Sequence, residues 1–167
     1  MKTRLILSFV ATVVLALLLR WQGAALVTPV SPYGIIDLEF AWHAEKLRQL
    51  QLFWPREVLS NNIYIDFLFL VAYGIFLYTA CQWRAAAILN QKAAAIFATL
   101  AVSAASLDLL ENFLMLLVWY GRFQPFVLKI IAVVAGIKFF LVIAVLLFLF
   151  ASFFMKRRKK EPTEASA

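Results

Sequence analysis

The segment Leu107-Asp108-Leu109-Leu110-Glu111-Asn112 places three polar side chains inside an apolar run that extends from Ala93 to Tyr120. That run is longer than the ~20 residues that an α-helix needs to cross the hydrocarbon core of a bilayer. Asp108, Glu111 and Asn112 are spaced i, i+3 and i+4, so a helix displays all three on one face. Because such groups are costly to expose to lipid, we expect other parts of the chain to cover this face.

The composition of the 167-residue chain indicates a membrane protein. Hydrophobic residues make up 65% and charged residues only 15%, and the mean hydropathy is +0.88. A soluble domain is about half apolar and about a quarter charged. The apolar residues fall into four blocks, which predicts an all-α integral membrane bundle of four transmembrane helices. This single membrane domain covers residues 1–155, with spans at about 3–21, 63–81, 93–120 and 126–155.

The positive charge is concentrated beside the spans. Much of the formal net charge of +7 comes from Lys156-Arg157-Arg158-Lys159-Lys160, directly after the last apolar block. Lys and Arg gather in the cytoplasmic segments next to spans and contact anionic lipid headgroups. Residues 156–167 are therefore predicted to be a basic cytoplasmic tail and not a nucleic-acid-binding segment. The same rule predicts that both termini are cytoplasmic and that residues 22–62 lie outside.

The first apolar block allows two interpretations. A basic start, an apolar run over Leu5–Leu19 and the small residues Gly23-Ala24-Ala25 are typical of a cleavable signal peptide. Arg20 lies between the run and the small residues, which disfavours cleavage, and a long basic side chain can snorkel at the end of a span. We therefore favour a retained first helix over cleavage of residues 1–25.

Residues 22–62 form a long polar stretch that contains a helical pattern. Side chains of one face recur at four-then-three spacing, at Ile36, Phe40, His43, Leu47, Leu50 and Trp54, while Glu39, Glu45, Lys46 and Arg48 fall elsewhere on the wheel. This predicts one external amphipathic helix over 37–54, which lies in the membrane interface or caps the bundle. Ser60-Asn61-Asn62 is predicted to provide the N-cap of the second span.

Polar residues on three spans form the candidate site. At about 1.5 Å per residue, Asp108 lies about 16 Å from Trp119 and Lys138 about 18 Å from Phe126, so both are close to the midplane. Lys138 is expected to pair with Asp108 or Glu111. The predicted binding residues are Asp108, Glu111, Asn112, Lys138, Tyr73 and Asp66. Asp66 alone, one turn inside its predicted span, is favoured as a cap or interfacial residue.

The rarity of cysteine and histidine excludes several kinds of chemistry. Cys81 and His43 are the only residues of their types, which rules out an intrachain disulfide, a paired-cysteine thiol oxidoreductase and a bis-histidine haem site. A metal site is weakly supported, and neither a phosphate loop nor a nucleophile elbow is present. No cofactor is expected. The buried polar residues are then either a structural cluster that fixes helix register or a pocket for a ligand, proton or cation.

Three acidic blocks of the sequence resemble those of a known group of proteins. The blocks are Asp37-Leu38-Glu39-Phe40-Ala41, then Asp66-Phe67-Leu68-Phe69-Leu70 with Tyr73, then Leu107-Asp108 followed by Glu111-Asn112. They are similar to blocks in a family of small bacterial four-helix integral membrane proteins, over residues 34–115. The resemblance implies a bacterial inner (plasma) membrane protein and supplies no catalytic residue. A looser likeness to the four-helix sterol-isomerase and sigma-2-receptor superfamily rests on helix count and buried acids.

The leading functional prediction is a non-enzymatic membrane protein that binds a small amphiphile, a cation or a partner helix through Asp108, Glu111, Asn112 and Lys138. Two alternatives stay open. One is a membrane-embedded enzyme with Asp108 or Glu111 as acid/base on a lipid or isoprenoid. The other is an accessory subunit of a larger membrane complex. Expected partners are membrane lipids, and beyond these a small amphiphilic ligand, a partner membrane protein or a second copy of the chain.

Overall fold

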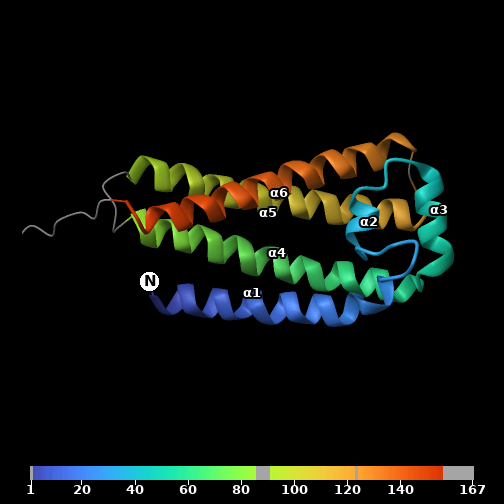
Figure 1. Ribbon diagram of the computed structural model, residues 1–167, viewed down its shortest axis with the longest axis horizontal. Helices are drawn as coiled ribbons and strands as arrows, with labels where there is room; N and C mark the ends of the chain where they lie inside the picture. Colours follow the sequence, from blue (N-terminus) through green and yellow to red (C-terminus); the bar gives the residue numbers. More distant parts are fainter. Residues whose placement is uncertain (1, 86–90, 123, 156–167) are drawn as a thin grey trace, which may run out of the picture.

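The computed structural model describes residues 2–85, 91–122 and 124–155. These residues form six α-helices and one 3₁₀ helix (η1, Gly23–Leu26), and no β-strand occurs among them. Four long helices run along one axis (Figure 1), namely α1 (Lys2–Gln22), α4 (Arg56–Ala85), α5 (Gln91–Trp119) and α6 (Phe126–Ser152). Each is long and apolar enough to cross a membrane, α1 together with η1. The predicted all-α architecture with four candidate spans is confirmed.

The second span begins earlier than the sequence indicated. Helix α4 starts at Arg56, directly after Pro55, whose carbonyl accepts hydrogen bonds from the amides of Val58 (3.1 Å) and Leu59 (3.4 Å). Proline suits the start of a helix because its missing amide would have no intrahelical partner there. Ser60-Asn61-Asn62 lies one turn inside α4, so its predicted N-cap role is wrong.

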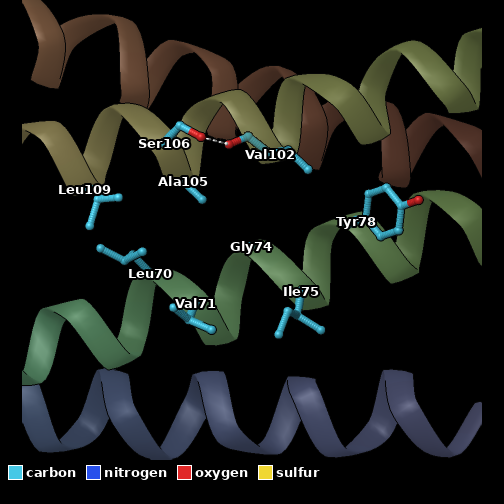
Figure 2. A pocket seen from close by; sticks show the side chains of 9 residues that line it. All are labelled: Leu70, Val71, Gly74, Ile75, Tyr78, Val102, Ala105, Ser106 and Leu109. Carbon is cyan, nitrogen blue, oxygen red and sulfur yellow. Dashed lines mark hydrogen bonds between the residues drawn. The ribbon is translucent and has the colours of Figure 1, made fainter.

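Helices α4, α5 and α6 form the packed part of the bundle, and small residues bring α4 and α5 close together. Ala94, Ala98, Ala101 and Ala104 of α5 are all buried. Gly74 of α4 faces Ala105 of α5 (Figure 2), and a Cβ at position 74 would lie 3.0 Å from the Ala105 Cβ. Small residues permit such close helix packing without a hydrophobic driving force.

Helix α1 packs on α4 and leaves most of its own surface exposed. Ser8 is its only buried side chain, and Leu17 and Trp21 are 62% and 77% exposed. Near its end, the Gln22 side chain donates a hydrogen bond to the Val58 carbonyl (2.8 Å) and accepts one from Asn62 (2.6 Å). Two amide side chains therefore fix the end of α1 against the first turns of α4.

The predicted single amphipathic helix over 37–54 is two short helices, α2 (Ile36–Glu39) and α3 (Ala44–Phe53). Between them His43 has an extended backbone, with φ −127° and ψ 143°. Helix α3 lies across one end of the bundle, called the α3 end below, whereas α2 lies between the ends of the long helices (Figure 1).

The chain breaks between α2 and α3 because the two halves are buried against different partners. Leu38 and Glu39 of α2 are buried among the long helices. Leu47, Leu50 and Trp54 pack into the core at the α3 end. The last three residues were expected on the buried face. The wheel was wrong for Ile36, Phe40 and His43, which are exposed, and for Glu39, which is 6% exposed.

At the opposite end of the bundle, Arg84 of α4 connects α4 to the end of α6. Its Nε donates to the Ser152 Oγ (2.8 Å), its guanidinium also bonds the Ser152 carbonyl, and its Cζ lies 4.6 Å from the centre of the Phe153 ring. A buried cation thus donates a hydrogen bond to a carbonyl at the end of α6. The start of α1 lies at this end too (Figure 1). The predicted basic tail, 156–167, falls outside the described residues.

Candidate functional site

Lys138 of α6 is the centre of a buried charge cluster. Its Nζ lies 3.0 Å from the Asp108 Oδ1, 2.8 Å from the Glu111 Oε2 and 3.7 Å from the Glu39 Oε1. Asp108 and Glu111 are one turn apart on α5 and are 4% and 0% exposed. The sequence analysis expected Lys138 to pair with one of these two acids, and it contacts both.

Tyr73 and Asn112 extend the cluster toward α4. The Tyr73 hydroxyl donates a hydrogen bond to the Asp108 Oδ2 (2.9 Å), so both oxygens of Asp108 are engaged. The Asn112 amide donates to the Asp66 Oδ2 (2.7 Å). Because α4 begins at Arg56, Asp66 lies well inside that helix, and the favoured cap role is wrong. All six predicted site residues lie in or beside one cluster.

Glu39 is a fourth acid that the helical-wheel argument placed on the polar side. It comes from α2, outside the long helices, and its Oε2 is buried without a hydrogen-bond partner. Gly34, at φ +62°, turns the chain into α2, and Lys46 of α3 lies 3.4 Å from Asp37 and fixes the two short helices together. The signal that could have found Glu39 is its place in the acidic block Asp37–Ala41.

The surroundings of Glu39 raise its pKa above the ordinary value of 4.5. Burial is the largest cause, because it penalises the charged carboxylate. Lys138 acts in the opposite direction, and Asp108 adds a further upward contribution. The net direction of the pKa is upward because the cost of burial exceeds the stabilisation of the carboxylate by Lys138.

A cavity of about 340 Å³ opens beside the cluster, and its lining comes from α1, α2, α4, α5 and α6. Its polar lining comes from Glu39, Asp66, Tyr73, Asp108 and Lys138. The rest is mostly apolar, from Thr12, Phe69, Phe76, Leu77, Phe139, Val142 and Leu146. Thr12 already donates its hydroxyl to the Ser8 carbonyl (2.8 Å).

The cavity is polar toward the α3 end and apolar further along the bundle. On α6, Leu146 lies about 12 Å beyond Lys138, and on α4, Leu77 lies about 16 Å beyond Asp66. Leu146 and Leu77 therefore lie further from the α3 end than Lys138 and Asp66 do, because α4 and α6 both begin at the α3 end. A cavity of this size accommodates a small ligand, and its lining suits one with a polar head and an apolar tail.

A second cavity, of about 390 Å³, lies on the α4/α5 surface around Gly74 (Figure 2). Its lining is almost entirely apolar, from Leu70, Val71, Ile75, Val102, Ala105 and Leu109. The Ser106 hydroxyl at its edge donates to the Val102 carbonyl of its own helix (3.0 Å; Figure 2). This groove offers no charged group for recognition, so the cavity beside Lys138 is the candidate site.

The donor set at the candidate site does not suggest a metal centre. Among the described residues, no group of three or more His, Cys, Asp or Glu side chains is arranged to hold a metal ion. Cys81 is buried and His43 is exposed at the start of α3. The groups present can hold a charge, donate hydrogen bonds and exchange protons.

Comparison of the chain with protein-family models, with curated protein sequences and with solved structures found no match. The resemblance to small bacterial four-helix membrane proteins therefore stays a prediction, and the functional argument rests on the geometry of the site.

Proposed function

We propose that the protein is an integral membrane protein whose cavity binds a small amphiphile. The observation that carries the proposal is the cavity itself, with a charged and hydrogen-bonding lining at one end and aromatic and aliphatic walls at the other. The polar head of the ligand lies beside Asp66, Asp108 and Lys138. Its tail lies along Phe76, Val142 and Leu146, where each buried methylene contributes about 0.8 kcal/mol.

We place the protein in a bacterial inner membrane with both termini in the cytoplasm. The charge pattern supports this orientation, since Lys2 and Arg4 begin α1 at the end of the bundle where α6 ends, and the basic cluster 156–160 follows α6 in the sequence. The α3 end then faces outward. Helix α3 lies in the outer membrane interface, with apolar Leu47 and Leu50 turned toward the bundle.

The contacts of the two central acids favour binding over acid–base catalysis. Both oxygens of Asp108 are occupied, by Lys138 and by Tyr73. Glu111 is fully buried and is not part of the cavity lining. An acid/base must reach the proton it transfers, and neither residue is free to do so. The enzyme alternative stays a prediction without support from this geometry.

The accessory-subunit alternative predicted an acidic face that the chain itself leaves uncovered. Asp108, Glu111 and Asn112 are 4%, 0% and 0% exposed, covered by residues of α2, α4 and α6. This face is therefore covered by the chain itself and is not available to a partner helix.

Native mass spectrometry of protein purified in a mild detergent tests the proposal. Wild-type protein is expected to carry an amphiphile of defined mass. Val142→Trp places a large side chain in the apolar half of the cavity and should reduce the bound fraction at least tenfold. Ile143→Trp is the matched control, because Ile143 is 54% exposed and lies outside the cavity lining.

Equal thermal stability of the two tryptophan variants shows that the loss comes from the cavity and not from misfolding. A wild-type protein without bound amphiphile, which also takes up none on addition, contradicts the proposal. Equal amphiphile binding by the two variants contradicts it as well.

A further inference from the structure

The charge of the cavity lining specifies the ligand more closely than its shape does. Four carboxyl groups, from Glu39, Asp66, Asp108 and Glu111, lie in or beside the cavity. Within the part of the chain that the structure describes, Lys138 is the only cation within ion-pair distance of any of them. The cluster therefore carries an excess of acid, and burying uncompensated charge is costly.

The four acids do not share Lys138 equally. The ammonium group is closest to Glu111 (2.8 Å) and Asp108 (3.0 Å), both on α5, and Asp108 also accepts the Tyr73 hydroxyl. These two acids form the compensated part of the cluster. Glu39 is further from Lys138, at 3.7 Å.

The two remaining acids face the cavity with incomplete compensation. Glu39 is 6% exposed, and its Oε2 has no hydrogen-bond partner. Asp66 has the neutral Asn112 amide as its partner and no cation within ion-pair distance among the described residues. Glu39 enters from α2 and Asp66 from α4, so both carboxyl groups line one cavity from different elements.

We infer that the ligand of this cavity carries a cationic head, such as a protonated or quaternary amine, which lies between Glu39 and Asp66. The inference rests on the amphiphile-binding function proposed above and adds the sign of the charge. The rings of Phe69, Phe139 and Tyr73 in the same lining favour a cation further, because aromatic faces attract positive charge. An anionic head would meet the three acids of the lining, Glu39, Asp66 and Asp108, and a neutral head would leave Glu39 and Asp66 uncompensated.

Three amphiphiles with the same twelve-carbon tail test the sign of the charge. Dodecyltrimethylammonium, dodecanol and dodecanoate are titrated into the full-length protein in nanodiscs of zwitterionic lipid, with empty nanodiscs as the baseline for partitioning. The quaternary head keeps its charge at every pH. We expect dodecyltrimethylammonium to bind at least tenfold more tightly than either of the others.

Variants of the two acids locate the charge recognition. Glu39→Gln and Asp66→Asn keep the size of each side chain and should each reduce the affinity for dodecyltrimethylammonium about tenfold, with a smaller effect on the affinity for dodecanol. Glu45→Gln, at an exposed position of α3, is the control. The comparison of the three heads on wild-type protein needs no variant, so it stands even if a variant fails to fold.

The outcomes separate the two proposals. If the three amphiphiles bind equally and Val142→Trp blocks them all, the cavity binds amphiphiles but the inferred preference for a cationic head is wrong. The carboxyl groups are then neutral because they are protonated. If none binds above the empty-nanodisc baseline, the amphiphile-binding function itself is overturned. If the charged head is preferred but neither acid variant weakens it, the placement between Glu39 and Asp66 is wrong.

Discussion

At the scale of single residues, Lys138 is the cation that compensates the buried carboxyl groups of the cluster among the described residues. Lys138 is 6% exposed and contacts carboxyl groups from two different elements, α2 and α5. Removing one partner of a buried ion pair leaves an uncompensated charge, whereas removing both is far less costly. The lysine and the acids around it should therefore show strong energetic coupling.

The first prediction concerns this coupling. Lys138→Met should lower the free energy of unfolding by about 3–5 kcal/mol, because Asp108 and Glu111 lose their shared cation. The double variant Lys138→Met/Asp108→Asn should recover part of that loss, since one of the stranded acids becomes neutral while its bond to Tyr73 can persist. Denaturant titration of the purified protein in mixed micelles measures both values. Equal instability of the single and double variants would show that the charges are not coupled.

The second prediction concerns pH and Glu39. Its pKa is raised in the folded protein, so the folded state binds the proton more tightly than the unfolded chain, whose carboxyl titrates near 4.5. Its stabilising contribution is complete below that value and is lost as the pH rises through the raised folded pKa. The facing groups are Asp66 and Tyr73 of α4, Asp108 and Glu111 of α5, and Lys138 of α6.

Glu39→Gln mimics the protonated carboxyl group and should remove this loss of stability. Thermal unfolding between pH 4 and pH 9 should therefore show the variant overtaking wild type at the alkaline end. Glu45→Gln should follow the wild-type curve because Glu45 is exposed. Parallel curves for wild type and Glu39→Gln would contradict an uncompensated Glu39 in the folded state.

Most residues of the site could be predicted from the sequence, because polar groups inside long apolar runs must find one another. Asp108, Glu111, Asn112 and Lys138 were identified by helical spacing and depth alone. Glu39 was not, because its burial depends on how the chain between α1 and α4 folds back. A helical wheel assumes one continuous helix, and that assumption fails at His43.

At the scale of elements, the contact between α4 and α5 depends on Gly74. A Cβ at this position would lie 3.0 Å from the Ala105 Cβ, while a Cβ at Gly136 of α6 meets nothing within 4 Å. The two glycines therefore offer the same substitution in a crowded and in an open environment.

The third prediction compares these two positions. Alanine favours a helix over glycine by up to about 1 kcal/mol, so Gly136→Ala should maintain or raise the thermal stability. Gly74→Ala should be less stable than Gly136→Ala by about 1–3 kcal/mol, because the two helix backbones must separate to admit the methyl group. Thermal unfolding in one detergent compares them. Equal stability of both variants would mean that α4 and α5 do not pack tightly at Gly74.

The element boundaries show which signals the sequence carries. The third and fourth spans were predicted at 93–120 and 126–155, close to Gln91–Trp119 and Phe126–Ser152, because their apolar runs end sharply. The start of α4 was placed too late because its first turns, with Glu57 and Asn61, are too polar to read as a span. Those turns are nevertheless helical, since Val58 and Leu59 pack into the core at the α3 end.

At the scale of the whole molecule, the fourth prediction concerns orientation. In a background with Cys81→Ala, a cysteine introduced as Gln49→Cys on α3 should react with a membrane-impermeant maleimide added to intact spheroplasts. A cysteine introduced as Thr3→Cys should react only after the membrane is permeabilised. Both positions are exposed. The reverse labelling pattern would place the α3 end in the cytoplasm and contradict the proposed orientation.

The depth of Lys138 also has an electrical consequence. Its position about 18 Å along α6 from the α3 end means that a cationic head arriving from outside crosses about half of the membrane potential. Moving one charge through 100 mV corresponds to about 2.3 kcal/mol, so half the field contributes about 1 kcal/mol, or roughly fivefold in affinity. Binding in proteoliposomes with and without a potassium diffusion potential measures this. We therefore expect the affinity of the cavity for a cationic head from outside to be about fivefold higher in an energised membrane than in a depolarised one.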